Sequence, residues 1–134
     1  MTDGESFEGA RRVVFGIADA LRRRDEAAAR ELLAEDMEHV TREGPKRGPD
    51  ALIEFWRLQA ERFNVTFELE GVFDAGDGKL VMLQTVTRRN PESGKVEMTA
   101  WPAAVIRVSN GKIVFLEGYQ DRRQAFIDCG LQPD

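Results

Sequence analysis

The chain has 134 residues, of which 42% are hydrophobic and 32% are charged, and its net charge is −5. This balance predicts a single globular domain over residues 1–134 with enough apolar side chains for a core. The acidic balance and scattered arginines argue against a nucleic-acid-binding face, and no apolar run approaches the ~20 residues of a membrane span.

Cysteine usage and the N-terminal segment indicate the compartment. Cys129 is the only cysteine, so no internal disulfide can form, and we expect a cytoplasmic protein. Residues 1–9 contain acidic side chains and no apolar run, which is unlike a signal peptide. We expect residues 1–6 to be flexible.

The first part of the chain has helical periodicity. One apolar stripe predicts a helix over 7–24, and its members are Ala10, Val14, Ile17, Ala18 and Leu21. Asp25 is placed to cap a second helix over 26–34. A short strand over 37–42 and a loop over 44–49 follow, and Pro49 can then start a third helix that reaches about residue 62.

From Asn64 onward the apolar period changes to two, which predicts strands. Strands are expected over 65–73, 79–89, 95–108 and 112–119, with turns at 74–78 and 90–94. Gly71 predicts a bulge and Pro102 a bend, and both would curl the sheet. Asn110-Gly111 is a strong hairpin signal because both residues tolerate positive φ. A short amphipathic segment over 122–131 ends the chain.

Helices followed by antiparallel strands indicate an α+β fold. We expect three helices on the concave face of a curved, mostly antiparallel sheet, as in a cystatin-like α+β roll. A curled sheet that is covered in this way leaves a cone-shaped pocket.

Several short motifs occur in an order that resembles the nuclear transport factor 2-like superfamily, nearest its SnoaL-like branch. That branch includes polyketide cyclases and is similar to ketosteroid isomerases and limonene epoxide hydrolases. The motifs are Ala20-Leu21 with Asp25, residues 32–37, Gly48 before residues 51–56, Asn110 to Ile113, and Gly118 to Asp121. The resemblance covers nearly the whole chain and implies the fold, but not an activity.

The resemblance also shows which catalytic groups this sequence lacks. The positions of the isomerase tyrosine, base aspartate and protonated aspartate fall on Ile17, Thr41 and Ala104. Those of the epoxide hydrolases fall near Gln84, Val86 and Gly118, and those of the cyclases near Gly118 and Ala104. None of these residues has the expected catalytic side chain, so whether the protein is an enzyme stays open.

Two residues remain as candidate acid–base groups. His39 is the only histidine, and its near-neutral pKa suits proton transfer, although a hydrogen-bonded histidine in a cavity wall is the simpler interpretation. Asp121 follows the last strand and could act at the pocket mouth, but it is also well placed to cap the final helix. One histidine without clustered carboxylates argues against a metal site, and no cofactor is implied.

Six further residues are candidates for the pocket wall. Met37 and Thr41 share a strand face with His39. Trp56 and Trp101 could stack on a flat ligand, or they could belong to a core or dimer interface. Gln84 is a polar residue on an apolar strand face. The pattern of the last strand leaves open which of its faces points inward, and Tyr119 is a wall candidate if its face does.

Three functional hypotheses follow. The first is a protein that binds a hydrophobic or aromatic small molecule in an apolar pocket. The second is a cofactor-independent isomerase, cyclase or hydratase that uses His39 and Asp121. The third is a non-catalytic interaction module. The resemblance implies a homodimer through the outer face of the sheet, and the apolar residues on both strand faces around Val81 and Leu83 agree with this.

Overall fold

The chain folds in the order α-α-β-β-α-β-β-β-β-β-α, in a computed structural model that describes residues 6–131. The helices and strands are α1 (Phe7–Arg22), α2 (Glu26–Glu31), β1 (Leu33–Thr41), β2 (Gly44–Arg47), α3 (Asp50–Phe63), β3 (Val65–Gly76), β4 (Lys79–Arg89), β5 (Val96–Ala100), β6 (Ala103–Ser109), β7 (Lys112–Tyr119) and α4 (Arg122–Asp128).

All strands belong to one sheet with the order β2-β1-β7-β6-β4-β3, and β5 pairs with β4. β1 and β7 are parallel, whereas the other neighbouring strands of the described chain are antiparallel. The predicted bulge lies between Leu69 and Gly71, and Pro102 separates β5 from β6. These two irregularities curve the sheet, which confirms the predicted α+β architecture.

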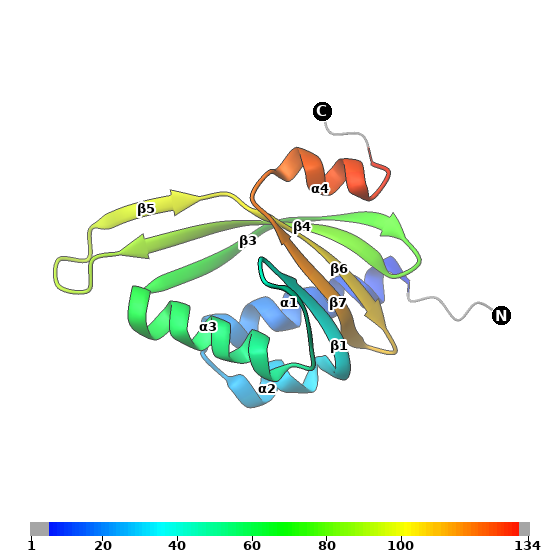
Figure 1. Cartoon of the computed structure of the whole chain (residues 1–134), viewed down its shortest axis with the longest axis horizontal. Coiled ribbons are helices and arrows are strands. Elements are labelled where there is room, and N and C mark those ends of the chain that lie inside the picture. The colour runs from blue at the N-terminus through cyan, green and yellow to red at the C-terminus, as the bar shows by residue number, and fades with distance from the viewer. Residues whose placement is uncertain (1–5, 132–134) are drawn as a thin grey trace.

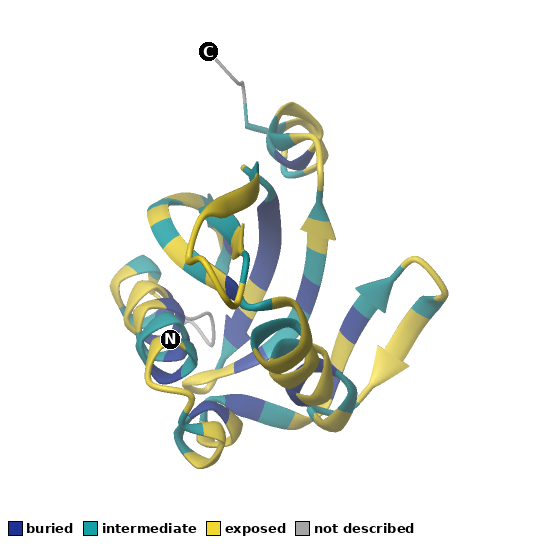
Figure 2. Ribbon diagram, turned by 90° about the vertical axis from the view of Figure 1, so that its left-hand side faces the viewer, coloured by how far each residue is buried: buried dark blue, intermediate teal, exposed yellow. Residues whose placement is uncertain are grey.

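The sheet separates two groups of helices. Figure 1 shows α1, α2 and α3 on one side and α4 on the other. We call the side covered by α1–α3 the inner face and the side that carries α4 the outer face. The larger buried cluster joins α1–α3 to inner side chains such as Met37, Leu80 and Ile106, and a smaller one joins Ala125 of α4 to Val81 and Val105. Figure 2 shows helices that are buried along one side and exposed along the other.

Side chains that accept backbone N–H groups begin three of the helices. Ser6 accepts from the amide of Gly9, Asp25 from that of Ala28, and Asp121 from that of Arg123. The latter two confirm the predicted caps, which satisfy otherwise unpaired donors. The flexibility expected for residues 1–6 falls mainly on residues 1–5, which lie outside the described part of the chain.

The predicted end of the second helix is wrong. α2 ends at Glu31, and the residues from Leu33 onward form β1 rather than a helix to residue 34 followed by a strand from 37. Leu33 pairs with Ile113 of β7, and both side chains are buried. This long-range pairing overrides the local helical pattern.

The loop predicted over 44–49 is also wrong in part. Residues 44–47 form β2, which pairs with β1 in a hairpin. Pro45 is accepted there because β2 is an edge strand, where a missing N–H leaves no neighbouring strand unpaired. α1 ends at Arg22, two residues earlier than predicted, and Arg24 adopts a positive φ of 56°.

The predicted turn at Asn110-Gly111 is confirmed. The two residues have φ values of 53° and 75°, and they join β6 to β7. Positive φ at both central positions defines the tight hairpin turn whose twist matches the strands. This turn sets the register of β7, the strand that contains Gly118.

Candidate functional site

Three of the positions at which the resemblance predicts catalytic groups lie side by side on the inner face. Ala104 of β6 pairs with Gly118 of β7, and the pairing of Val40 with Glu117 places Thr41 of β1 on the other side of Gly118. Ala104 is part of the inner buried cluster, so the row faces α1–α3. The fold therefore brings Thr41, Ala104 and Gly118 together, but their side chains cannot act as strong acids or bases. The Thr41 hydroxyl donates to the carbonyl of Gly44.

Gly118 marks an opening in the inner face. It is exposed, although β7 lies between β1 and β6 in the interior of the sheet. A Cβ atom added at Gly118 would meet no atom within 4 Å, and its φ is not in the left-handed region. The glycine is therefore not required by the backbone. Its small size leaves space next to Ala104 and Thr41.

His39 lies on the same face, in the same strand as Thr41. It pairs with Leu116, a member of the inner cluster, and only 9% of its surface is exposed. Its ring lies 6.5 Å from that of Phe55 on α3, centroid to centroid. The Nδ1 atom is buried and has no hydrogen-bond partner in the described part of the chain. Burial, and secondarily the Lys46 charge, lowers the pKa of His39 from its ordinary value of 6.5.

Two more wall candidates belong to the inner face. Met37 is completely buried in the inner cluster, so it supports the wall from within the core. Gln84 pairs with Leu69, which packs against that cluster, and the Gln84 side chain is half-buried. The structure thus places Met37, His39, Thr41 and Gln84 on one face, as the alternating pattern predicts.

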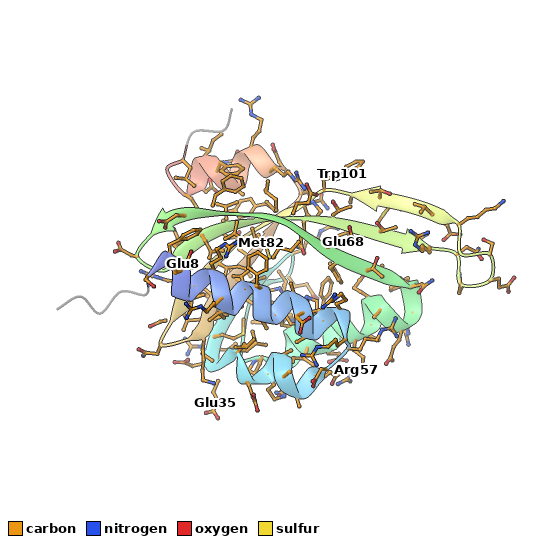
Figure 3. The ribbon with its side chains drawn as sticks, turned by 180° about the vertical axis from the view of Figure 1, so that it is seen from behind. Glu8, Glu35, Arg57, Glu68, Met82 and Trp101 are labelled. Carbon is orange, nitrogen blue, oxygen red and sulfur yellow. The ribbon has the colours of Figure 1, made fainter. Side chains whose placement is uncertain are left out.

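Trp56 lines a different hollow, between α1, α2 and α3. This cavity measures about 110 Å³, and its lining includes Ala20, Leu21, Ala29, Ile53, Trp56 and Ala60. Charged side chains surround it, among them Arg57, which donates two hydrogen bonds of 2.6 Å to the carboxylate of Glu26. Figure 3 shows Arg57 on the helical side of the molecule.

The remaining candidates lie away from the inner face. Tyr119 packs in the outer cluster, and its hydroxyl is 2.8 Å from a carboxylate oxygen of Asp128. Burial, together with this acidic partner, raises the pKa of Tyr119. Asp121 caps α4 and is exposed. Trp101 is 57% exposed and lies beside the start of α4 (Figure 3). The structure therefore does not bring His39 and Asp121 together.

A larger groove lies on the outer face. It measures about 470 Å³, and its lining includes Glu38, Lys79, Arg107, Phe115, Glu117 and Cys129. Burial raises the pKa of the Cys129 thiol, so the thiol is not activated. The sequence pattern did not indicate this groove. The groove exists because α4 covers only part of the outer face of the sheet.

Two features bear on other classes of function. Within residues 6–131, no three histidine, cysteine or acidic side chains are grouped closely enough to bind a metal ion. No helix in the described part of the chain combines the length and apolar character needed to cross a bilayer.

The SnoaL-like domain model matches residues 14–116, which is most of the chain. The chain belongs to the SnoaL-like domain family. No curated protein has a significant match to this SnoaL-like chain.

Solved structures show the same architecture. An NTF2-like protein from Burkholderia thailandensis is 27% identical, with a TM-score of 0.68 and coverage of 92% of this chain and 98% of that one. A Mycobacterium tuberculosis protein in complex with estradiol-17β-hemisuccinate is 15% identical, with a TM-score of 0.69 and coverage of 83% and 92%. A polyketide cyclase-like protein from Sinorhizobium meliloti is 21% identical, with a TM-score of 0.66 and coverage of 79% and 92%.

Sequence reasoning missed two features of this SnoaL-like site. One is the opening at Gly118, which was considered only as a replaced catalytic position. A glycine in an otherwise apolar strand was the available signal, since such a residue often marks a close approach or an open space. The other is the contact between His39 and Phe55, which depends on where α3 crosses the sheet and has no local signal.

Proposed function

We propose that this SnoaL-like protein binds an apolar small molecule on the inner face, over the opening at Gly118. The observation that carries the proposal is an exposed glycine in an interior strand, with open space where a side chain would project. Apolar walls with a few polar groups are typical of ligand sites. Ala104 and Leu116 supply apolar wall beside the opening, and His39 and Gln84 supply polar groups.

One comparison supports the proposed ligand class. The M. tuberculosis neighbour was solved with a steroid derivative, which is a mainly apolar molecule. The hollow beside Trp56 is less suitable as the main site for an apolar ligand, because charged side chains such as Arg24, Glu26 and Arg57 line it.

An enzyme that uses His39 with Asp121 has less support. The carboxylate of Asp121 bonds the backbone of α4 on the outer face, whereas His39 faces the helices of the inner face. An acid–base pair needs both groups within reach of one substrate or one water. Isomerase, cyclase or hydratase chemistry would therefore depend on His39 without this partner.

The binding proposal is tested by filling the opening. We expect Gly118→Leu to weaken the binding of estradiol or 2-naphthol about tenfold or more, equal to a loss of at least about 1.4 kcal/mol, because the new side chain occupies the ligand's space. Isothermal titration calorimetry measures the affinity, and thermal unfolding checks that the variant is folded.

Glu117→Leu is the matched control. It places the same side chain at the neighbouring position of β7, where it faces the outer groove. We expect this variant to bind the probes like the wild type. Unchanged affinity in Gly118→Leu, or equal losses in both variants, would contradict the proposed site.

We also propose that the protein forms a homodimer through the outer face. The apolar outer residues Val81 and Val105 give no support to this proposal, since α4 of the same chain covers them. The support for a dimer comes from the charged residues that line the outer groove. Lys79 and Arg107 lie opposite each other across β4 and β6 at one side of the groove, whereas Glu38 and Glu117 lie on β1 and β7.

The arrangement of these four charged residues is compatible with a dimer that has two-fold symmetry. Within residues 6–131, none of these four side chains has an ion pair. Like charges that face each other across strands are unfavourable, so Lys79 and Arg107 gain from an acidic neighbour. A copy related by a two-fold axis can place its acidic side over them, and the reverse contact follows from the symmetry.

A further inference from the structure

We propose that the hollow between α1, α2 and α3 binds a small aromatic carboxylate, whose ring enters beside Trp56 and whose carboxylate contacts Arg24. This inference does not rest on the proposed inner-face function. The described residues that line the hollow come from the three helices and from the link between α1 and α2, and none of them belongs to a strand. The two sites therefore lie in different parts of the molecule.

The shape of the hollow suits one aromatic ring. Its apolar lining consists of the indole of Trp56, two larger aliphatic side chains and three alanines, namely Leu21, Ile53, Ala20, Ala29 and Ala60. The short alanine side chains leave room beside the indole, on which an aromatic ring can pack. The cavity volume of about 110 Å³ approaches the ~150 Å³ of an apolar cavity that holds benzene. A single ring therefore fits, and its substituent extends to the charged rim.

The backbone at Arg24 points to a role for its side chain other than stability. α1 ends in a Schellman motif, in which the N–H of Asp25 donates to the carbonyl of Ala20 at 2.9 Å and that of Arg24 to the carbonyl of Leu21 at 3.1 Å. Arg24 has a φ of 56° and occupies the left-handed position of this motif, where glycine is the usual residue. An arginine there costs conformational free energy that glycine would avoid, and residues held in this way cluster at functional sites.

Arg24 also differs from the neighbouring arginines in its charge partners. Arg22 and Arg23 both donate to the carboxylate of Asp19, whereas Arg24 forms no ion pair within residues 6–131. The Arg24 side chain is exposed and lines the hollow. A guanidinium group presents several N–H donors that match a carboxylate, so Arg24 is free to bind one.

The acidic side chains at the rim have basic neighbours of their own. Asp25 pairs with Arg23 at 3.1 Å, and Glu26 accepts two hydrogen bonds of 2.6 Å from Arg57. The pKa of Arg57 is raised, mainly by Glu26 and to a smaller extent by the charge of Glu61, so Glu61 also acts on this guanidinium. These neighbours offset much of the negative charge around the hollow. The charges therefore favour a carboxylate over an ammonium group.

Three probes of similar shape test the charge of the ligand. Phenylacetate carries a carboxylate, phenylacetamide a neutral group of almost the same size, and phenethylamine an ammonium group. We expect the wild type to bind phenylacetate about three- to tenfold more tightly than phenylacetamide, the range of a partly exposed charged hydrogen bond, and to bind phenethylamine more weakly than either. Isothermal titration calorimetry measures the affinities. No binding of phenylacetate, equal affinity for the amide, or a preference for the amine overturns the proposal.

Arg24→Gly separates binding from folding. Because glycine suits the left-handed position, we expect the variant to melt at the same temperature as the wild type or higher. It should lose the preference for phenylacetate and keep its affinity for phenylacetamide. Arg12→Gln is the control, since it removes the same charge from an exposed position in the first half of α1 and should keep the preference. A lower melting temperature of Arg24→Gly, a preference that survives in it, or equal losses in both variants overturns the role of Arg24.

Two substitutions on α3 locate the ring. Ala60→Leu fills the hollow, whereas Gln59→Leu adds the same side chain at a neighbouring position outside the described lining. We expect Ala60→Leu to weaken phenylacetate binding about tenfold or more, because its side chain occupies the space of the ring, and Gln59→Leu to leave it unchanged. Thermal unfolding checks that both variants are folded. Equal effects of the two substitutions overturn the proposed site.

Tryptophan fluorescence gives a second measurement of where the ring lies. The sequence contains two tryptophans, so Trp101→Phe leaves Trp56 as the single reporter. We expect phenylacetate to change the fluorescence of this variant in step with the calorimetric binding curve. Binding that leaves the Trp56 signal unchanged overturns the contact.

The inner-face site and this site fail separately. Gly118→Leu, which fills the inner-face opening, should bind phenylacetate like the wild type. If Gly118→Leu loses phenylacetate and Ala60→Leu retains it, the acid binds at the inner face, which overturns this inference and supports the inner-face function. Loss of estradiol binding in Gly118→Leu concerns the inner-face function alone.

Discussion

At the scale of single residues, His39 combines an unfavourable burial with a position in the middle of the inner wall. Burial and the charge of Lys46 lower the pKa of His39, and Nδ1 has no partner in the described chain. A buried polar atom without a partner lowers the free energy of unfolding, so the burial of His39 does not add to the stability of the fold.

The lowered pKa of His39 predicts how stability depends on pH. The unfolded chain binds a proton at His39 near pH 6.5, whereas the folded chain binds it only at lower pH. Because the unfolded state then holds more protons, the free energy of unfolding falls as pH drops below about 6.5. One such group gives a slope of at most about 1.4 kcal/mol per pH unit.

Urea unfolding at pH 7.5 and pH 5.5 measures this effect. We expect the wild type to lose stability between these values and His39→Asn to lose less. Carboxyl groups with lowered pKa values, such as Glu26 and Asp128, titrate below their ordinary values of 4.5 and 3.8 and so outside this range. Equal losses in the two proteins would contradict the prediction.

At the scale of elements, Arg122 joins α4 to the bend between β5 and β6. Its guanidinium donates to the carbonyls of Trp101 and Gln84 at 2.7 and 2.9 Å and to the carboxylate of Glu70 at 2.8 Å. Glu70 also accepts from the hydroxyl of Thr85. One side chain thus fixes the bend at Pro102, β4 and the bulged part of β3 relative to one another.

Removing this side chain should destabilise the protein. We expect Arg122→Ala to lower the free energy of unfolding by about 1–3 kcal/mol, because two backbone carbonyls lose a charged donor. Urea denaturation measures the change. Arg123→Ala is the control: that side chain is exposed and should change stability by no more than about 0.5 kcal/mol. Equal effects of the two substitutions would contradict the role of Arg122.

At the scale of the whole molecule, the sheet divides two kinds of surface. The inner face combines an apolar wall with the opening at Gly118, which suits a small molecule. The outer face is covered by α4 over its apolar part and leaves a charged groove beside it. The proposed ligand site and the proposed dimer contact therefore lie on opposite faces of the sheet.

Charge reversal tests the proposed dimer. We expect sedimentation equilibrium to show a dimer that weakens as salt increases, because the contacts are charged and screened. Arg107→Glu should raise the proportion of monomer, and adding Glu117→Arg should reverse this. Arg12→Glu is the control, since Arg12 is an exposed residue of α1 on the opposite side. A wild-type monomer at every concentration would contradict the proposal.

Much of the fold was predictable from local patterns. The apolar stripe of α1, the caps at Asp25 and Asp121, the bulge at Gly71 and the turn at Asn110-Gly111 depend on neighbouring residues, and their signals are local. The end of α2 and the start of β1 were not predictable in this way. They depend on the pairing of Leu33 with Ile113, which lies 80 positions further along the chain.

The features of the candidate site also divide into those with a local sequence signal and those that depend on long-range contacts. Strand alternation by itself places Met37, His39 and Thr41 on one face, since side chains two residues apart point the same way. Only the tertiary structure shows that Gly118 leaves open space, that Phe55 approaches His39, and that Tyr119 and Asp121 lie on the other side. These facts depend on which strands and helices meet, and contacts between distant segments leave no periodic trace in the sequence.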